Sequence, residues 1–280
     1  MQFAVAVVSP PGYVHSEAFR EVAEGLHYAL RALGHDSLLT DRLDYDNRHT
    51  IVLGSNLLAH YGLEPPTNPI LYNLEQVCGG SPWMTPALLA LFRRYPVWDY
   101  SQANIGQLAA WHVPQLTHVP VGYVPELTRI AAVPEDIDVL FYGSRSARRH
   151  AVLDALRARG FRVEWLFGVY GAGRDAMIAR SKIVINMHLC EAKVFEIVRV
   201  SYLLANSRAV VSERGTNPAE DGDLESGIAF AAYDELVDRC VALLGDDSAR
   251  RELGQRGYRA FAARSQVAIL SDVLSSSLDR

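Results

Sequence analysis

The stretch DVLFYGSRSARRHAVLDALRARG, residues 138–160, decides the fold class of this chain. It opens with an apolar run that ends in glycine and continues with apolar residues at helical spacing. The spacing predicts a buried strand over 138–143 and a helix over 146–160. A strand that passes directly into a helix is the building unit of α/β proteins with parallel sheets, and we expect that class here.

The same alternation continues on both sides of this stretch. Downstream it predicts strands at 162–167, 182–188, 209–212 and 227–231, and helices at 174–181, 191–206, 233–244 and 247–263. Upstream it predicts strands at 3–8, 37–40, 51–54, 69–73 and 117–121, and helices at 16–34, 84–94 and 102–111. The first of these helices has Ser16 as its expected N-cap.

The alternation of strands and helices is interrupted once, by a proline-containing stretch with little periodicity. It therefore predicts two Rossmann-like, doubly wound domains that face a cleft. We expect an N-terminal domain at 1–124, a linker at 125–136, a C-terminal domain at 137–263 and a helical tail at 264–280. Folds of this kind bind ligands at the carboxyl ends of their strands.

Composition excludes several classes of protein. The 280 residues carry 27 Lys and Arg against 32 Asp and Glu, a net charge of −5, which gives no basic surface for a nucleic-acid partner. Cys78, Cys190 and Cys240 form no paired motif and fit a reducing compartment. Without a signal peptide or a long apolar run, we expect a cytoplasmic protein. Residues 87–95 are apolar and then basic, which predicts a buried helix or, less favoured, contact with a membrane surface.

An anion site is predicted where the strand 138–143 meets its helix. Gly143, Ser144 and Arg145 precede the helix, and Arg148 and Arg149 lie in its first turn. Helix N-termini have unpaired N–H groups, and arginines there can hold a diphosphate. The alternative is a solvated basic turn, which is unfavourable at a helix N-terminus unless an anion compensates it.

A second group of candidates follows the strand 182–188. His188 ends that strand and is either a structural residue or a ligand contact. Lys193, Glu196 and Arg199 are spaced by three along the predicted helix 191–206, so they form one polar stripe. The stripe is either an exposed ion-pair ladder or a lining in which Glu196 accepts hydrogen bonds from sugar or ribose hydroxyls.

These segments together resemble a known family. HVPVGY, followed by DIDVLFYGSRSARRHAVLDALRARG, resembles the entry into the donor-binding domain of GT-B-type glycosyltransferases. KIVINMHLCEAKVFEIVRVSYLLANSRAVVSE and SGIAFAAYDELVDRCVALLGDDSARRELGQRG look like the rest of that domain, and YNLEQ at 72–76 looks like a segment of some bacterial members. The resemblance is strongest over 117–263.

The resemblance implies a transferase with a nucleotide-sugar donor and no further cofactor or metal. It implies that the donor binds the C-terminal domain, with Arg145 and Arg149 at the family's basic diphosphate pair, and that the acceptor binds the N-terminal domain. The acceptor stays open: a glycan, a lipid-linked molecule, a protein or a small molecule. Many retaining members carry two glutamates eight positions apart, but here the second position is Tyr202, and the nearby acids are Glu191 and Glu196.

Two other classes of function stay open. Gly171-Ala-Gly173-x-x-Ala176 follows a strand and opens a helix, like the fingerprint of an NAD(P)-dependent oxidoreductase, although that fingerprint normally follows the first strand of its domain. A non-catalytic nucleotide- or sugar-binding module would explain the missing glutamate spacing. The pairs Asp44-x-Asp46 and Asp136-x-Asp138 are too short a pattern to predict a metal site.

The acceptor side has its own candidates. The loop Pro10-Pro11-Gly12-Tyr13 follows the first strand, so His15 and Glu17 are expected at the rim of the site, and Glu75 follows the strand 69–73. Glu75 or His15 is the predicted base if the enzyme inverts, because either group can take a hydroxyl proton near neutral pH. The alternative is that His15 is a loop residue and Glu17 only favours the helix N-terminus.

Overall fold

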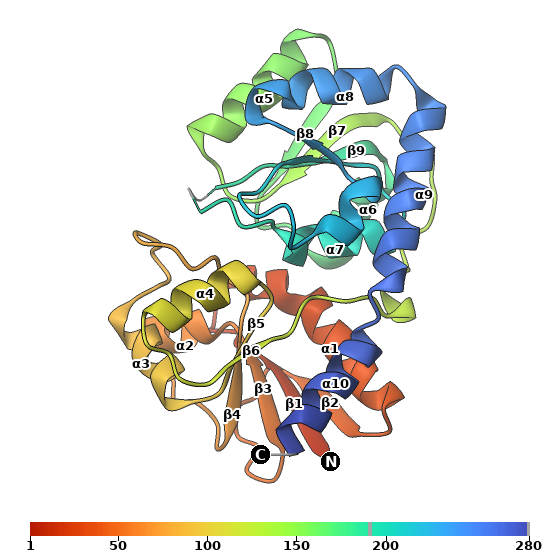
Figure 1. The fold of residues 1–280 in the computed structure, drawn as a ribbon. Helices are drawn as coiled ribbons and strands as arrows, with labels where there is room; N and C mark the ends of the chain where they lie inside the picture. Colours follow the sequence, from red (N-terminus) through yellow and green to blue (C-terminus); the bar gives the residue numbers. More distant parts are fainter. Residues whose placement is uncertain (190–191, 279–280) are drawn as a thin grey trace. The chain divides into compact units, whose positions relative to one another are not determined.

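The structure is a computed structural model that describes residues 1–189 and 192–278 (Figure 1). The chain divides into two compact units: the first is Met1–Glu126 with Ser265–Arg280, and the second is Leu127–Arg264. Each unit is an α/β layer structure with its own sheet.

The first unit is built on a six-stranded parallel sheet of order β2-β1-β3-β4-β5-β6. Its strands are β1 (Gln2–Val7), β2 (Asp36–Thr40), β3 (His49–Leu53), β4 (Pro69–Asn73), β5 (Val97–Asp99) and β6 (Leu116–His118). The apolar runs form central strands because helices cover both faces of the sheet, so alternate side chains are buried on either side. The short strand β5 was not predicted.

Helices α1 (Arg20–Ala32) and α10 (Gln266–Leu278) lie on one face of this sheet, and α2 (Ser55–Tyr61), α3 (Pro86–Arg94) and α4 (Gln102–Ala110) lie on the other (Figure 1). The helix α2 was not predicted. Ser16 was expected to cap the first helix, and that expectation is wrong: Val14–Phe19 forms a 3₁₀ turn, η1, and α1 begins only after Phe19. Ser16 is buried within that turn.

The C-terminal segment belongs to the first unit. The chain leaves this unit after Glu126, within the 3₁₀ turn η2 (Pro125–Leu127), and returns to it at Ser265. Ser265 forms a β-bridge with Tyr123. The side-chain amide oxygen of Gln266 accepts a hydrogen bond of 2.7 Å from the backbone N–H of Gly122. The segment expected as a tail therefore forms α10, which packs against α1.

The second unit has a five-stranded parallel sheet of order β11-β10-β9-β7-β8. Its strands are β7 (Ile137–Tyr142), β8 (Val163–Leu166), β9 (Ser181–Asn186), β10 (Val210–Glu213) and β11 (Ala229–Ala231). Its helices are α5 (Ala147–Ala158), α6 (Gly171–Ala179), α7 (Ile197–Ala205), α8 (Leu236–Leu244) and α9 (Asp247–Ala263), with 3₁₀ turns η3 (Gly222–Gly227) and η4 (Tyr233–Glu235).

The core of the second unit lies between the sheet and α5 and α8, which cover one face, while α6 and α7 cover the other (Figure 1). Helix α9 packs against η3 so closely that a Cβ on Gly227 would lie 2.4 Å from the Cα of Gly257. Only glycine allows that backbone contact. Within the described residues, no helix is both long and apolar enough to cross a membrane.

Candidate functional site

In each sheet, the order in which the chain adds strands reverses once, and the candidate sites lie at or next to these two switch points. In the second unit, β7 has β8 on one side and β9 on the other, so the chain reverses its direction of growth between β7 and β9. In the first unit the same reversal lies between β1 and β3. Ligands of doubly wound sheets bind outside the carboxyl ends of the strands at such a switch point.

The loop after β7 carries Arg145 into solvent. Gly143 has a φ of +144°, and a Cβ there would lie 3.0 Å from an Nη of Arg199, so the turn requires glycine. Ser146 caps α5 by accepting a hydrogen bond from the backbone N–H of Arg149 at 3.3 Å. Ser144 and Arg145 are exposed just before this helix N-terminus, and Arg145 forms no hydrogen bond or ion pair with another described residue.

Arg149 lies in a different environment from Arg145. Its side chain is 1% exposed, and its guanidinium donates to the carbonyls of Ser144 at 2.9 Å and Met187 at 2.6 Å. It also lies over the ring of Phe141, 4.9 Å from the centroid. Arg149 therefore ties the loop after β7 to the segment after β9.

His188 was expected to end its strand, but β9 ends at Asn186, and His188 lies two residues beyond it, where Glu196 holds it. The imidazole Nδ1 lies 3.1 Å from Oε1 and 3.0 Å from Oε2 of that carboxylate. His188 is 1% exposed, and its Nε2 is buried with no hydrogen-bond partner among the described residues. A buried polar atom without a partner costs free energy unless a ligand or water supplies one, so this atom is a candidate ligand contact.

Glu196 and Asn186 link His188 to Arg199. The amide of Asn186 donates to Glu196 at 2.9 Å and to Ser212 at 3.0 Å, and its oxygen accepts from Arg199 at 2.8 Å. Burial alone would raise the pKa of Glu196, but the hydrogen bond with His188 and the charges of His188 and Arg199 outweigh it and lower that pKa. Glu196 is therefore a carboxylate at neutral pH.

Glu213, at the end of β10, is a second buried carboxylate. Arg148 binds it with two hydrogen bonds of 2.5 Å and stacks over the ring of Tyr233, and the backbone N–H of His188 donates to it at 3.2 Å. Burial would raise the pKa of Glu213, but Arg148 and His188 lower it. Lys193 Nζ lies 3.7 Å from the same carboxylate. Glu213 was not among the predicted site residues, although its place at the carboxyl end of a strand was a signal in the sequence.

The predicted polar stripe on helix 191–206 is wrong. Helix α7 begins only at Ile197, Glu196 is its N-cap, and Lys193 has a left-handed φ of +48° in the preceding loop. Of the three stripe residues, only Arg199 lies in a helix. Glu191 lies outside the described residues. Tyr202, where the sequence resemblance led us to look for a glutamate, donates its hydroxyl hydrogen to Asp175 at 2.8 Å and accepts from Arg129 at 2.9 Å.

The site in the first unit centres on Glu75, in the loop after β4. Asn56, in the first turn of α2, donates to Oε1 of Glu75 at 3.2 Å. Burial raises the pKa of Glu75 to about 7, although that hydrogen bond opposes the shift. Burial and the charge of Glu75 also raise the pKa of Tyr13, so the loops after β1 and β4 meet here. His15 contacts the ring of Tyr13 with centroids 5.4 Å apart.

A buried amide network fixes the backbone of Glu75. The carbonyl of Glu75 accepts from the side chains of Asn73 at 2.9 Å and Asn104 at 3.1 Å. Both asparagines also donate to Asp99, at 2.6 Å and 3.0 Å. Asp99 ends β5, a strand that was not predicted from the sequence, so this network was not expected either.

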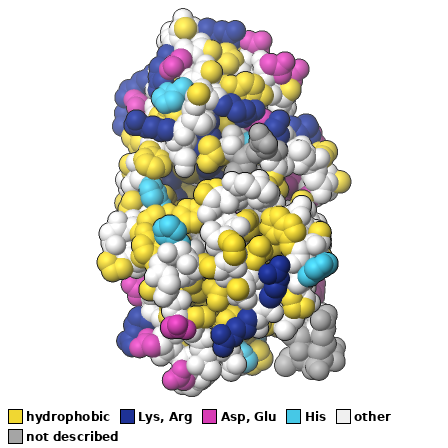
Figure 2. Space-filling model, turned by 90° about the vertical axis from the view of Figure 1, so that its left-hand side faces the viewer, with side chains coloured by type: hydrophobic (Ala, Val, Ile, Leu, Met, Phe, Trp, Pro, Cys, Tyr) yellow, Lys and Arg dark blue, Asp and Glu magenta, His cyan; other side chains and the backbone are white. Residues whose placement is uncertain are grey.

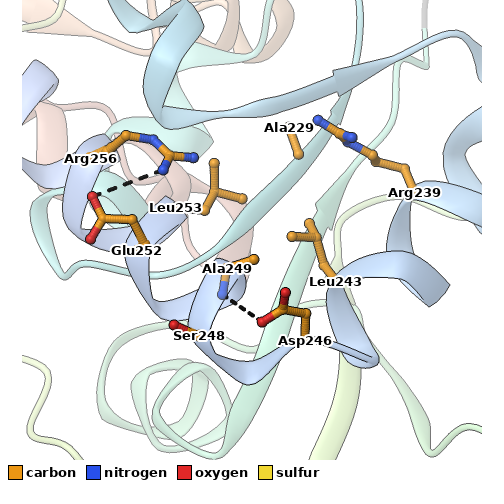
Figure 3. A pocket seen from close by; sticks show the side chains of 9 residues that line it. All are labelled: Ala229, Arg239, Leu243, Asp246, Ser248, Ala249, Glu252, Leu253 and Arg256. Carbon is orange, nitrogen blue, oxygen red and sulfur yellow. Dashed lines mark hydrogen bonds and ion pairs between the residues drawn. The ribbon is translucent and has the colours of Figure 1, made fainter.

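A cavity of about 480 Å³ opens elsewhere on the second unit (Figure 3). It is lined by Ala229, Arg239, Leu243, Asp246, Ser248, Ala249, Glu252, Leu253 and Arg256. Ala229 begins β11, so this cavity lies at the amino end of that strand. Arg256 faces the cavity beside Glu252, with nitrogen and oxygen 3.9 Å apart, and Asp246 caps α9. No predicted site residue lines it.

The glycine loop at 171–176 forms the start of α6. Gly171 has a φ of +54°, and no atom lies within 4 Å of a Cβ built on it, so no close approach of the backbone explains this glycine. The loop follows β8, which is the edge strand of its sheet. The aspartates of both short acidic pairs are engaged: Asp44 with Arg42, Asp46 with Thr67, Asp136 with Arg162 and Arg180, and Asp138 with Lys182. In the described part of the chain, no group of three or more His, Cys, Asp or Glu residues could hold a metal ion.

Comparison with known proteins gives relatives of sequence and of structure. No protein-family model matches the chain. It is 27% identical over 256 residues to Uncharacterized protein L140 of Acanthamoeba polyphaga mimivirus, which covers 85% of this chain and 82% of that protein. AviGT4, a glycosyltransferase involved in avilamycin A biosynthesis, matches with a TM-score of 0.62 at 17% identity, over 98% of this chain and 96% of that one. HepE of Anabaena, in complex with UDP and glucose, matches with a TM-score of 0.63 at 11% identity, over 100% and 99%.

Proposed function

We propose that this chain, whose two α/β units have the GT-B fold of the glycosyltransferases it resembles, transfers a sugar from a nucleoside-diphosphate donor to an acceptor hydroxyl. The expected fold is confirmed by the solved structures, which match over nearly the whole chain. The observation that carries the proposal is the switch point between β7 and β9, where an exposed arginine, a helix N-terminus and a buried histidine nitrogen without a partner come from neighbouring strand ends.

On the donor side, Arg145 and the N-terminus of α5 bind the diphosphate. Both are sources of positive potential, and neither is neutralised by a described carboxylate. As the bond to the sugar breaks, negative charge grows on the leaving diphosphate, and these groups stabilise it without reorganising. We expect no metal to be required for this step.

His188 completes the donor site through Nε2. Because Glu196 accepts at Nδ1, the neutral imidazole carries its proton on Nδ1 and leaves Nε2 as an acceptor, whereas the imidazolium donates from both nitrogens. A nucleotide-sugar offers both hydroxyl donors and phosphate acceptors, so either form has a partner. Glu196 acts here as a positioning residue. Lys193 and Arg199 lie beside the same site, near Glu213 and Asn186.

On the acceptor side, Glu75 takes the proton of the attacking hydroxyl if the reaction inverts the anomeric centre. A carboxyl group with a pKa of about 7 is half ionised at neutral pH, which suits a general base. Its backbone is fixed by Asn73 and Asn104, so the group needs little reorganisation. His15 is the second candidate for this role.

The first experiment is calorimetry of the chain with UDP, GDP, TDP and NAD. We expect a nucleoside diphosphate to bind and NAD to bind far more weakly; the reverse would favour the oxidoreductase function. Slow hydrolysis of the matching nucleotide-sugar separates an enzyme from a binding module. Arg145→Ala should weaken nucleotide binding about tenfold, with Arg251→Ala on the exposed face of α9 as the matched control. Equal affinity of both variants and wild type would remove Arg145 from the site.

A further inference from the structure

The first unit carries a connected group of rings that the donor chemistry does not use. This ring cluster comprises Tyr13, His15, His60, Tyr61 and Trp83. We propose that it is a binding platform for a saccharide, so that the acceptor is a glycan or a glycoside whose hydroxyl is presented to Glu75. This inference rests on the proposed glycosyl transfer and names the class of its acceptor.

The rings contact one another edge to face in a continuous chain. Tyr13 lies 5.4 Å from His15 and 6.1 Å from Tyr61, measured between ring centroids. Tyr61 lies 4.9 Å from His60, which lies 5.8 Å from Trp83. Their interplanar angles of 64° to 79° leave ring faces that are not stacked on one another.

These rings are not part of the hydrophobic core. Tyr61 is 45% exposed, His60 is also exposed, and Tyr13, His15 and Trp83 are half-buried. Figure 2 views the first unit from the side of α2 and α3, and it shows hydrophobic side chains with histidines among them on that surface. Exposed aromatic groups gathered in one place mark a binding surface more often than scattered ones do.

The cluster adjoins Glu75, the half-buried carboxyl group that we propose as the base on the acceptor side. Tyr13 lies in the loop after β1 and His60 and Tyr61 lie in the helix after β3, so the cluster spans the switch point of this sheet. The charge of Glu75 acts on Tyr13, and Asn56 of α2 hydrogen-bonds Glu75. Ring faces and polar groups therefore come from the same elements.

This combination matches the chemistry of a sugar ring. A pyranose has one face of C–H groups, which packs on an aromatic ring, and a rim of hydroxyls, which need hydrogen-bond partners. The cluster supplies the rings, together with the Tyr13 and Tyr61 hydroxyls and the His60 imidazole at its surface, while Glu75 and Asn56 supply buried polar atoms. An acyl chain would use the ring faces but would offer no hydroxyl to the carboxyl group of Glu75, which has a hydrogen bond from Asn56 at one oxygen.

The experiment is saturation-transfer NMR with methyl glycosides of glucose, galactose, mannose and N-acetylglucosamine, each added alone to the full chain. We expect at least one of them to receive magnetisation from the protein. Tyr61→Leu and Trp83→Leu should each raise its Kd about threefold to tenfold, since leucine keeps apolar volume but removes the ring. Trp111→Leu is the matched control, because Trp111 is a half-buried tryptophan of the same unit outside the cluster.

Calorimetry with UDP on the same variants separates the two proposals. The saccharide platform is wrong if no glycoside binds, or if the cluster variants bind the glycoside as tightly as wild type does. If UDP still binds wild type and all variants with equal affinity, the donor assignment stands. If phosphatidylglycerol vesicles bind wild type and lose that binding in Trp83→Leu, the cluster is a membrane contact and the inference is overturned. If wild type binds no nucleotide, the proposed function itself fails.

Discussion

The imidazole of His188 and the carboxylate of Glu196 form a buried pair, with Nδ1 3.0 Å from Oε2 and side chains that are 1% and 12% exposed. The two residues lie near the two ends of the segment that joins β9 to α7. The pair fixes the orientation of Nε2 of His188, a buried polar atom that has no hydrogen-bond partner among the described residues. The donor site that we propose therefore requires the contact between His188 and Glu196.

Glu196→Gln should destabilise the protein, because it removes the negative charge between His188 and Arg199. We expect the free energy of unfolding to fall by about 1–3 kcal/mol at pH 7. Since the folded protein lowers the pKa of Glu196, the wild-type advantage is complete above the usual pKa of a glutamate and is lost as the pH falls through the lowered value. Urea unfolding from pH 7 down to about pH 4 measures this gap, which should narrow in acid. Glu126→Gln, at an exposed position, is the control, and a gap independent of pH would contradict the ionic pair.

Arg149→Met should cost stability rather than nucleotide affinity. The change leaves the carbonyls of Ser144 and Met187 without their charged donor, and we expect a loss of about 2–4 kcal/mol in the free energy of unfolding. Arg145→Ala, four residues earlier, should leave the unfolding midpoint unchanged and weaken nucleotide binding. Denaturation and calorimetry on both variants test this division. If Arg149→Met is as stable as wild type but binds no nucleotide, the roles must be exchanged.

Glu75→Gln should make the protein more stable at alkaline pH and lower its transfer rate. The folded protein raises the pKa of Glu75 to about 7, above its value in the unfolded chain. Protonated Glu75 therefore adds to the free energy of unfolding at low pH, and this contribution is lost as the pH rises through about 7. A glutamine at this position cannot ionise, so the stability of Glu75→Gln should not fall with pH in this way. Its midpoint of urea unfolding at pH 8 should exceed that of wild type. A destabilised variant at pH 8 would show that the carboxylate is well solvated.

The transfer rate should rise with pH through an apparent pKa near 7 if Glu75 is the base. Glu75→Gln should then lower kcat about 100-fold or more while the affinity for the nucleotide is retained. His15→Asn is the parallel variant, and the base is the residue whose loss removes the rising limb. If both variants keep that limb, the base lies elsewhere.

Transfer should continue in excess EDTA, because Arg145 and the α5 N-terminus are proposed to neutralise the leaving diphosphate. The assay compares initial rates with EDTA, Mg²⁺ and Mn²⁺ in the same buffer. Complete loss of activity in EDTA, restored by either ion, would assign the charge neutralisation to a metal instead.

The sequence by itself determined the α/β class, the two Rossmann-like units and the strand ends at which Gly143, His188 and Glu75 lie. Apolar runs and helical spacing are local signals, and parallel strands must be joined by crossovers, so the pattern leaves few architectures. The sequence pattern did not predict α2, which has only seven residues, or β5, whose three residues VWD form no apolar run. It extended α7 over 191–206 because spacing by three does not show that Lys193 adopts a left-handed φ.

Only the tertiary structure decided which polar residues are free to act. Arg145 and Arg149 are near neighbours in one basic run, yet one is exposed and the other is buried against carbonyls from two strand ends. Likewise, Glu213 and Arg148, and Glu75 and Asn56, are brought together from separate elements. Burial and partners of a side chain depend on residues far away in the chain, and these set its charge and its availability, so no local pattern could have given them.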